Sequence, residues 1–349
     1  MAYSDIDKPS DYFETITYTG TGATGNSQTV GFQPDFIWFK NRSTGDDHAL
    51  FDSVRGRTKI LLSNGTNAEI TGTTDLESFD SNGFTVGVPN QVSSPNRSGS
   101  SIVSWNWLAG GTASSNTDGS ITSQVSASTT SGFSIVSYTG TGANATVGHG
   151  LGVAPAVVLV KDRTTAGYDW FMYHHKNTSE PATDYLRLNL TNATTDNVVV
   201  WNDTAPTSSV FSIGTSVGVN ANTDEYIAYC FSEVKGFSKF GSYTGNGSTD
   251  GTFVYTGFKP AMIIWKNSSN AYNWVISDNK RNTFNDVDKY LLPNTSGAEG
   301  TLTLVDFLSN GFKIRTTDAS INNSSDTIIY MCFAENPFTT STGIPTTAR

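Results

Sequence analysis

The chain has 349 residues and a formal net charge of −10, and only 15% of its residues are charged. A typical globular protein carries about 25% charged residues, so Ser, Thr, Asn and Gly must cover much of this surface. The acidic net charge and the lack of a Lys/Arg cluster exclude generic nucleic-acid binding as a function. No apolar run reaches the roughly 18 residues that a membrane span needs. A 12% share of aromatic residues beside many turn residues favours thin β-sheet cores over helical bundles.

One phrase is written three times along the chain. Each copy begins with a proline and ends six residues later with a lysine: Pro34 and Lys40, Pro155 and Lys161, Pro260 and Lys266. The residues between them, DFIWF, AVVLV and AMIIW, predict a strand that is buried on both faces. Upstream of each copy lies a YTG-x-G stretch, which predicts a turn or a flexible loop. These stretches start at Tyr18, Tyr138 and Tyr243.

Residues 1–109 form the first predicted unit. After its repeated phrase, further strands are expected in HALFDSVRG from His48, around Phe84, and in SIVSWNW up to Trp107. Residues 110–131, GGTASSNTDGSITSQVSASTTS, show no hydrophobic periodicity and are interpreted as a linker or a long surface excursion.

Two further predicted units, residues 132–235 and 236–349, repeat this order of strands, and the last one ends in a short C-terminal tail. Phe237 and Phe240 lie at the tight junction between them and predict that these two units pack together. The sole helix candidate is a weak one, NKRNTFNDVDKY in the third unit.

The three units predict an all-β fold of three tandem antiparallel β-sandwiches, because each has six to eight short strands separated by turn residues. Each unit is long enough to bury its own core. The residues expected to be buried are Phe36, Trp38, Val158, Leu159, Ile263, Ile264, Ile329 and Phe333. Cys230 and Cys332 lie at matching positions in apolar runs, so we expect buried free thiols in two different cores.

Two acid–base pairs are the most suggestive constellation for a site. Asp52 and Arg55 in the first unit stand at the same distances from their proline as Asp278 and Arg281 in the third. The second unit reads WFMYHHKNT there and lacks the pair. Two interpretations stay open: a ligand-facing pair on a loop, or an ion pair that stabilises the turn after the strand.

Four aromatic residues are candidates for an exposed platform on which sugar rings stack: Trp170, Tyr173, Trp201 and Trp274. Packing inside the sandwich cores is the alternative interpretation for each of them.

The sequence offers little for catalysis or for metal binding. It contains no G-x-S-x-G nucleophile motif, and its acidic residues are too numerous to single out a pair. His174 and His175 are adjacent, so on a strand they would point to opposite faces, and we expect an exposed pair at a strand end. We therefore expect no enzymatic activity, no cofactor and no metal site.

Long phrases carry a resemblance, among them DKPSDYFETITYTGTG, QPDFIWFKNRS, FDSNGFTVG, WNDTAPTSSVFSIG and YIAYCFSEVKGFSKFGSYTGNGSTDG. Through them nearly the whole chain, from Asp7 to about Thr347, resembles a family of marine bacteriophage proteins that are labelled virion structural proteins, tail-fibre proteins or adhesins. The resemblance implies jelly-roll or concanavalin A-like (laminin-G-like) sandwiches and a place on the virion surface. It supplies no catalytic or binding residues.

Three functions follow as expectations. The leading one is a non-enzymatic virion structural protein, displayed on the particle surface as a tail fibre or receptor-binding protein, whose repeated loops engage host-surface glycans. The second is a capsid-decorating or shaft protein with a purely architectural role, and the third is a capsular polysaccharide depolymerase. The expected partners are other virion proteins and further copies of the chain, with a homotrimer expected by analogy with phage fibres.

Overall fold

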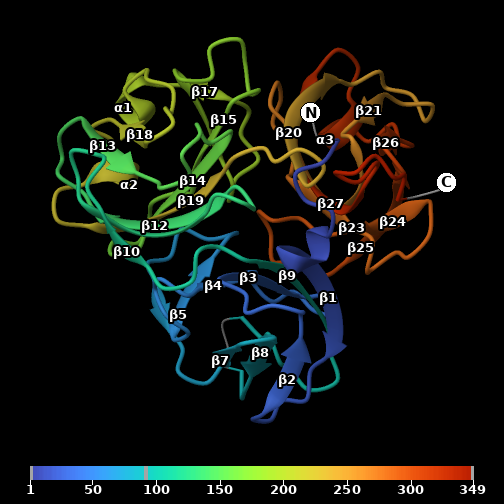
Figure 1. Ribbon diagram of the computed structural model, residues 1–349, viewed down its shortest axis with the longest axis horizontal. Helices are drawn as coiled ribbons and strands as arrows, with labels where there is room; N and C mark the ends of the chain where they lie inside the picture. Colours follow the sequence, from blue (N-terminus) through green and yellow to red (C-terminus); the bar gives the residue numbers. More distant parts are fainter. Residues whose placement is uncertain (1–2, 90–92, 347–349) are drawn as a thin grey trace.

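The computed structural model describes residues 3–89 and 93–346, and its regular structure is almost entirely β-strand (Figure 1). The helices in these residues are single turns: η1 (Pro9–Asp11), α1 (Val198–Trp201), α2 (Val217–Asn220) and α3 (Ala319–Asn322). The all-β prediction is therefore confirmed. The weak helix candidate at residues 279–290 is wrong, because that segment is a turn and a loop followed by strand β24 (Val287–Tyr290).

Unit 1 contains strands β1 to β9. Their bounds are β1 (Phe13–Thr19), β2 (Asn26–Thr29), β3 (Phe36–Asn41), β4 (Ala49–Asp52), β5 (Lys59–Leu62), β6 (Ile70–Thr71), β7 (Leu76–Asp80), β8 (Gly83–Val86) and β9 (Ser101–Trp107). They form a large sheet of order β1-β9-β3-β4-β5-β6 and a small sheet of order β2-β8-β7.

Unit 2 contains strands β10 to β19. Their bounds are β10 (Ser114–Asn116), β11 (Ser123–Ser128), β12 (Phe133–Thr139), β13 (Ala145–Gly148), β14 (Val157–Asp162), β15 (Phe171–His174), β16 (Asp184–Arg187), β17 (Thr195–Asp196), β18 (Val210–Ile213) and β19 (Glu225–Phe231). The large sheet has the order β10-β11-β12-β19-β14-β15-β16-β17, and β13 pairs with β18.

The predicted linker at residues 110–131 is corrected by this sheet. The segment holds two strands, β10 and β11, which belong to the large sheet of unit 2, and β11 pairs along β12. The small polar residues of β11 hide the strand in the sequence, and backbone hydrogen bonds with a neighbour create it, since strand formation depends on context more than on intrinsic preference.

Unit 3 contains strands β20 to β27. Their bounds are β20 (Ser238–Thr244), β21 (Phe253–Tyr255), β22 (Phe258–Asn267), β23 (Val275–Asp278), β24, β25 (Gly300–Leu308), β26 (Gly311–Ile314) and β27 (Thr327–Pro337). The sheets have the orders β20-β27-β22-β23 and β21-β26-β25-β24. In every unit, the strand of the repeated phrase lies between the last strand of the unit and the strand that follows the phrase.

The strands of the repeated phrase are buried on both faces, as the sequence predicts. In β3, Phe36 and Trp38 join a core shared by all three units, whereas Ile37 and Phe39 join the core of unit 1 beneath its small sheet. The same alternation in β14 and β22 places Val157, Leu159, Met262 and Ile264 in the shared core and Val158, Val160, Ile263 and Trp265 in the separate cores. A sheet covered on both sides requires a continuous apolar run.

The shared core is centred on three equivalent aromatic residues. Trp107, Phe231 and Phe333 stand opposite Phe36, Val157 and Met262, each of which lies two residues after the proline of a repeated phrase. Their ring centroids lie 6.4, 5.5 and 5.9 Å apart, with each pair packed edge to face. The three sheets that contain the repeated-phrase strands therefore surround an approximate threefold axis within one chain (Figure 1). The expected sandwich cores exist, but the three units also pack on one another and are not independent domains.

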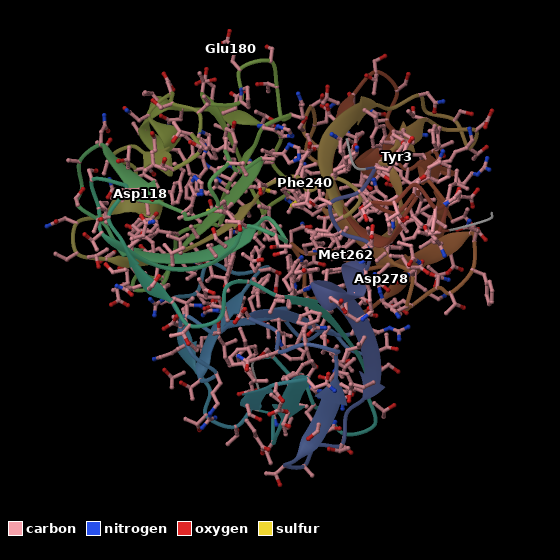
Figure 2. All side chains as sticks on the ribbon, viewed as in Figure 1. Tyr3, Asp118, Glu180, Phe240, Met262 and Asp278 are labelled. Atoms are coloured by element: carbon pink, nitrogen blue, oxygen red, sulfur yellow. The ribbon has the colours of Figure 1, made fainter. Side chains whose placement is uncertain are left out.

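The individual burial predictions are confirmed. All eight residues expected in cores are at most 7% exposed. Cys230 and Cys332 are free and buried in the separate cores of unit 2 and unit 3. Phe237 and Phe240 lie in the shared core, so units 2 and 3 do pack together there. Figure 2 shows Phe240 and Met262 where the units meet, with Glu180 at the periphery.

The ends of the described chain lie beside unit 3 (Figure 1). The backbone N–H of Asp5 donates to Lys235 O at 2.9 Å, and Ile6 is buried in the shared core. The tail turns back through a bridge between Thr339 and Pro345. The end of the predicted tail, residues 347–349, lies outside the described residues.

Candidate functional site

The two acid–base pairs are buried inside the protein. The guanidinium Nε of Arg55 lies 2.5 Å from Asp52 Oδ2, Arg281 Nε lies 2.6 Å from Asp278 Oδ2, and all four side chains are 0% exposed. In each pair the other carboxylate oxygen accepts the backbone N–H of the arginine, which holds the turn after the strand. The ligand-facing interpretation is wrong because solvent reaches neither pair, and the turn-stabilising interpretation describes them.

Each pair also accepts a hydrogen bond from an aromatic residue of a neighbouring unit. The Tyr229 hydroxyl of unit 2 donates to Asp52 Oδ2 at 2.7 Å, and the indole N–H of Trp105 in unit 1 donates to Asp278 Oδ2 at 3.1 Å. The two donors occupy the same register position in β19 and β9. Each aspartate thus accepts hydrogen bonds from the arginine of its own pair and from a donor in a neighbouring unit.

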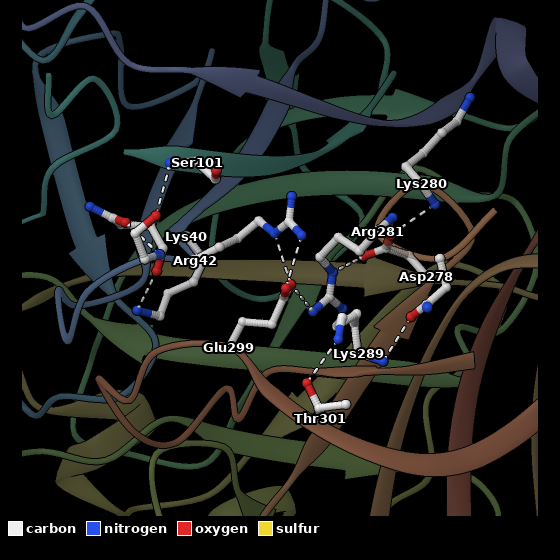
Figure 3. A network of polar contacts seen from close by, with 12 residues as sticks. Lys40, Arg42, Ser101, Asp278, Lys280, Arg281, Lys289, Glu299 and Thr301 are labelled. Carbon is white, nitrogen blue, oxygen red and sulfur yellow. Dashed lines mark hydrogen bonds and ion pairs between the residues drawn. The ribbon is translucent and has the colours of Figure 1, made fainter. Parts of the chain in front are cut away.

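A second carboxylate extends this contact between units 1 and 3 (Figure 3). Glu299 of unit 3 accepts two hydrogen bonds from Arg42 of unit 1, at 2.8 and 2.9 Å, and contacts Arg281 Nη1 at 3.2 Å. Glu69 makes the corresponding contacts between units 1 and 2. A bidentate arginine–carboxylate pair fixes orientation as well as distance, so these pairs align the sheets relative to each other.

Unit 2 has a histidine where the others have aspartate. His174 occupies the register position of Asp52, is 0% exposed, and has Nε2 3.2 Å from Tyr330 O of unit 3. The next residue, His175, has Nε2 2.7 Å from Phe240 O. The expectation of an exposed pair is wrong, because this strand end faces unit 3. Burial lowers the pKa of His174 to about 3, so the ring is neutral near pH 7.

The predicted tryptophans also connect units. Trp170 Nε1 donates to Leu62 O of unit 1 at 2.8 Å, and Trp274 Nε1 donates to Arg187 O of unit 2 at 2.9 Å. Both side chains are buried in the shared core. His48 of unit 1 holds the equivalent position, since its backbone N–H also donates to an asparagine side chain, as those of the two tryptophans do.

Tyr173 and Trp201 lie in the separate core of unit 2, 5% and 3% exposed, with ring centroids 6.3 Å apart. The expected exposed platform is therefore wrong for all four aromatic residues. Large rings bury the most apolar area, and here they fill the space between sheets and between units.

Three side-chain contacts run round the molecule in one direction. Unit 2 reaches unit 1 through Trp170, unit 3 reaches unit 2 through Trp274, and unit 1 reaches unit 3 through Lys40, whose Nζ donates to Ser296 O at 3.0 Å. Head-to-tail contacts that return to their starting point form a closed ring. In this protein a single chain provides all three members of the ring.

The lysines of the repeated phrase are buried and bonded to main-chain carbonyls. Lys40 Nζ lies within hydrogen-bond distance of four carbonyl oxygens, and Lys266 Nζ lies within that distance of three, including Thr191 O of unit 2. Lys161 donates to Tyr168 O at 2.8 Å. Burial lowers the pKa of each lysine to about 8.

These lysines predict that stability rises with pH between about 8 and 9. Over this range the unfolded chain, with lysine pKa values near 10.5, binds more protons than the folded chain. Above about pH 9 the buried cysteines and tyrosines oppose the trend, because burial raises their pKa in the folded chain alone. Urea denaturation at several pH values measures the slope, which Lys161→Met should reduce and Lys239→Met, at a partly exposed surface pair, should not. A flat or falling profile would contradict the assignment.

The YTG-x-G stretches are clamped, and sequence reasoning missed the clamps. The hydroxyls of Tyr18, Tyr138 and Tyr243 donate to main-chain carbonyls just before the last strand of their unit. A buried asparagine beside that carbonyl accepts the first N–H after the YTG glycine and donates to two carbonyls. These asparagines are Asn96, Asn220 and Asn322.

A sequence signal for the clamps exists, because each asparagine stands five residues before the first residue of β9, β19 or β27. The glycine of each YTG stretch is required by the same contact. A Cβ at Gly20 would lie 2.2 Å from Arg97 O, and the other two copies are as close. The predicted flexible loops are therefore fixed loops.

Because the predicted site residues are buried, the hollows on the surface are the remaining candidates for a binding site. One of about 650 Å³ lies on unit 3 beside Phe284, and one of about 460 Å³ lies between Tyr3 and Tyr255. Among residues 3–89 and 93–346, no His, Cys, Asp and Glu side chains gather as a metal site would require. None of the helices in that part of the chain is long and apolar enough to cross a membrane.

The fold and this network define an all-β protein whose three sandwich units close into one body. The chain belongs to the family described as a domain of unknown function (DUF7483), whose model matches residues 8–337. A single match thus spans all three units, as expected if they form one body. No curated protein matches the chain.

Proposed function

We propose that this protein is a non-enzymatic bacteriophage structural protein, displayed on the particle surface as a tail-fibre or receptor-binding component, which engages host-surface glycans. The observation that supports it best is the closed ring of units, because a stiff body holds its outer loops in fixed positions for recognition. The predicted aspartates and arginines hold that body together. The resemblance of the long phrases supplies the phage context.

Immunogold labelling of intact phage particles that carry this gene tests the display. Gold is expected on the particle exterior, at the tail. Particles without gold, when the same antibody labels the purified full chain and an immunoblot of disrupted particles, would contradict surface display.

The architectural alternative, a capsid-decorating protein, is favoured by one observation: the approximate threefold axis gives the chain a shape that suits a threefold position on a particle. Gold on the head would favour this function over attachment.

The depolymerase alternative is tested by incubating the full chain with host capsular polysaccharide and measuring reducing ends. We expect no release above that of buffer, because the recurring aspartates are 0% exposed and cannot reach a glycosidic bond.

A further inference from the structure

Unit 3 departs from unit 1 at one loop. Three residues separate Arg55 from Lys59, whereas seven separate Arg281 from Lys289. The flanking residues are equivalent, because both arginines make the buried ion pair and both lysines donate to a threonine hydroxyl on the adjacent strand. The four extra residues are not needed for the frame that the two units share. We call residues 282–286 the inserted loop.

The inserted loop presents a phenyl ring to solvent. Phe284 is 75% exposed, the highest value among the large apolar side chains in the described residues. The loop is braced on both sides of this ring: Asn282 Oδ1 accepts the N–H of Lys289 at 2.7 Å, and the Asn285 amide exchanges two hydrogen bonds of 2.9 Å with the backbone of Phe307. A ligand that covers the ring would therefore meet a largely ordered loop, which lowers the entropic cost of binding.

The ring stands at a hollow of about 650 Å³ that is part apolar and part polar. Its lining residues are Lys259, Asn279, Asn282, Thr283, Phe284, Asn285, Val287, Phe307, Leu308 and Ser309. Amides and hydroxyls beside apolar side chains form the mixture typical of small-ligand sites, and the volume is within their usual range. A protein interface is instead a broad patch of roughly 800 Å² on each partner.

One wall of the hollow carries charges that cancel. Glu335 Oε2 accepts from Lys259 Nζ and from Asn279 Nδ2, both at 2.8 Å. Asn279 Oδ1 is buried and has no hydrogen-bond partner in the part of the chain that the structure describes. A buried acceptor without a donor is costly, so a rotation of the Asn279 side chain that brings Oδ1 to the hollow would let a ligand hydroxyl satisfy it.

From these contacts we infer that the hollow beside the inserted loop binds a neutral saccharide, with one sugar ring packed on Phe284 and its hydroxyls meeting the Asn279 wall. The C–H face of a pyranose is apolar and slightly positive, which suits the negative face of a phenyl ring. The neutralised wall favours a neutral sugar over an acidic one, as does the net charge of −10. This inference rests on the proposed function and gives it a site.

Affinity electrophoresis of the full chain tests the site. The native gels contain dextran, mannan or a neutral galactan, with alginate as the acidic comparison. At least one neutral polymer is expected to retard the chain, with an apparent affinity that Phe284→Ala weakens roughly tenfold or more. Asn279→Ala should also weaken retardation. The matched control Phe253→Ala removes a 43% exposed phenyl from β21 of the same unit and should leave retardation unchanged.

Thermal melting of each variant confirms that it is folded. Retardation by a neutral polymer that survives in Phe284→Ala overturns the site but not the proposed function. Absence of retardation by every neutral polymer, or retardation by alginate alone, overturns the neutral-saccharide inference. Sedimentation that shows self-association of the full chain, lost in Phe284→Ala, would assign the hollow to a second copy instead. The gold labelling tests surface display, the part of the proposed function that does not depend on this hollow.

Discussion

Asp278→Ala is expected to lower the free energy of unfolding by about 3–5 kcal/mol, the usual cost of removing one partner from a buried ion pair. The Arg281 side chain is 0% exposed, and in this variant its guanidinium loses the nearest carboxylate. It also leaves the indole N–H of Trp105 without its acceptor. Urea denaturation followed by circular dichroism measures the loss.

The matched control is Asp250→Ala in the same unit. Asp250 is 82% exposed and pairs with Lys313 at the surface, so its removal is expected to cost less than about 1 kcal/mol. If Asp278→Ala costs no more than this control, the buried pair does not hold unit 3 to unit 1.

Ile264→Asp is expected to destabilise the whole chain by more than about 4 kcal/mol, because it places a carboxylate without a partner in the shared core. Ile264 is 4% exposed and belongs to the cluster that all three units contribute to. Loss of this core should therefore unfold the units together. Far-UV circular dichroism, tryptophan fluorescence and pulse proteolysis should give coincident transitions.

Leu302→Asp serves as the control, since Leu302 is 40% exposed in the same unit and the change should stay within about 0.5 kcal/mol. A separate early transition of unit 3, with units 1 and 2 still folded, would show that the shared core does not couple the units.

Much of the fold could be predicted because strand patterns are local. The repeated apolar phrase indicates a strand covered on both sides, and Phe36 and Ile37 are indeed buried on opposite faces of β3. The same pattern could not say what covers each face. A strand face needs the same apolar side chains whether the small sheet of its own unit or the other two units pack on it.

The candidate site was mostly misplaced, for related reasons. A tryptophan such as Trp170 suits a sugar platform or a core, and its contact with Leu62 O arises from chain segments 108 residues apart. A polar segment such as β11 becomes a strand through its partner rather than its own residues. The segment around Phe284 was interpreted as a weak helix candidate and not as a site, because its extra length matters only beside the equivalent loop of unit 1.

The sequence by itself determined the three repeats, the all-β class, the strands of the repeated phrase and the two free cysteines, since each depends on residue type and short-range spacing. Only the tertiary structure decided that the units close around a shared core, that Asp52 and Asp278 face neighbouring units, and that Phe284 stands at an open hollow. These features depend on contacts between residues far apart in the chain, and such contacts are set by how whole sheets pack against one another.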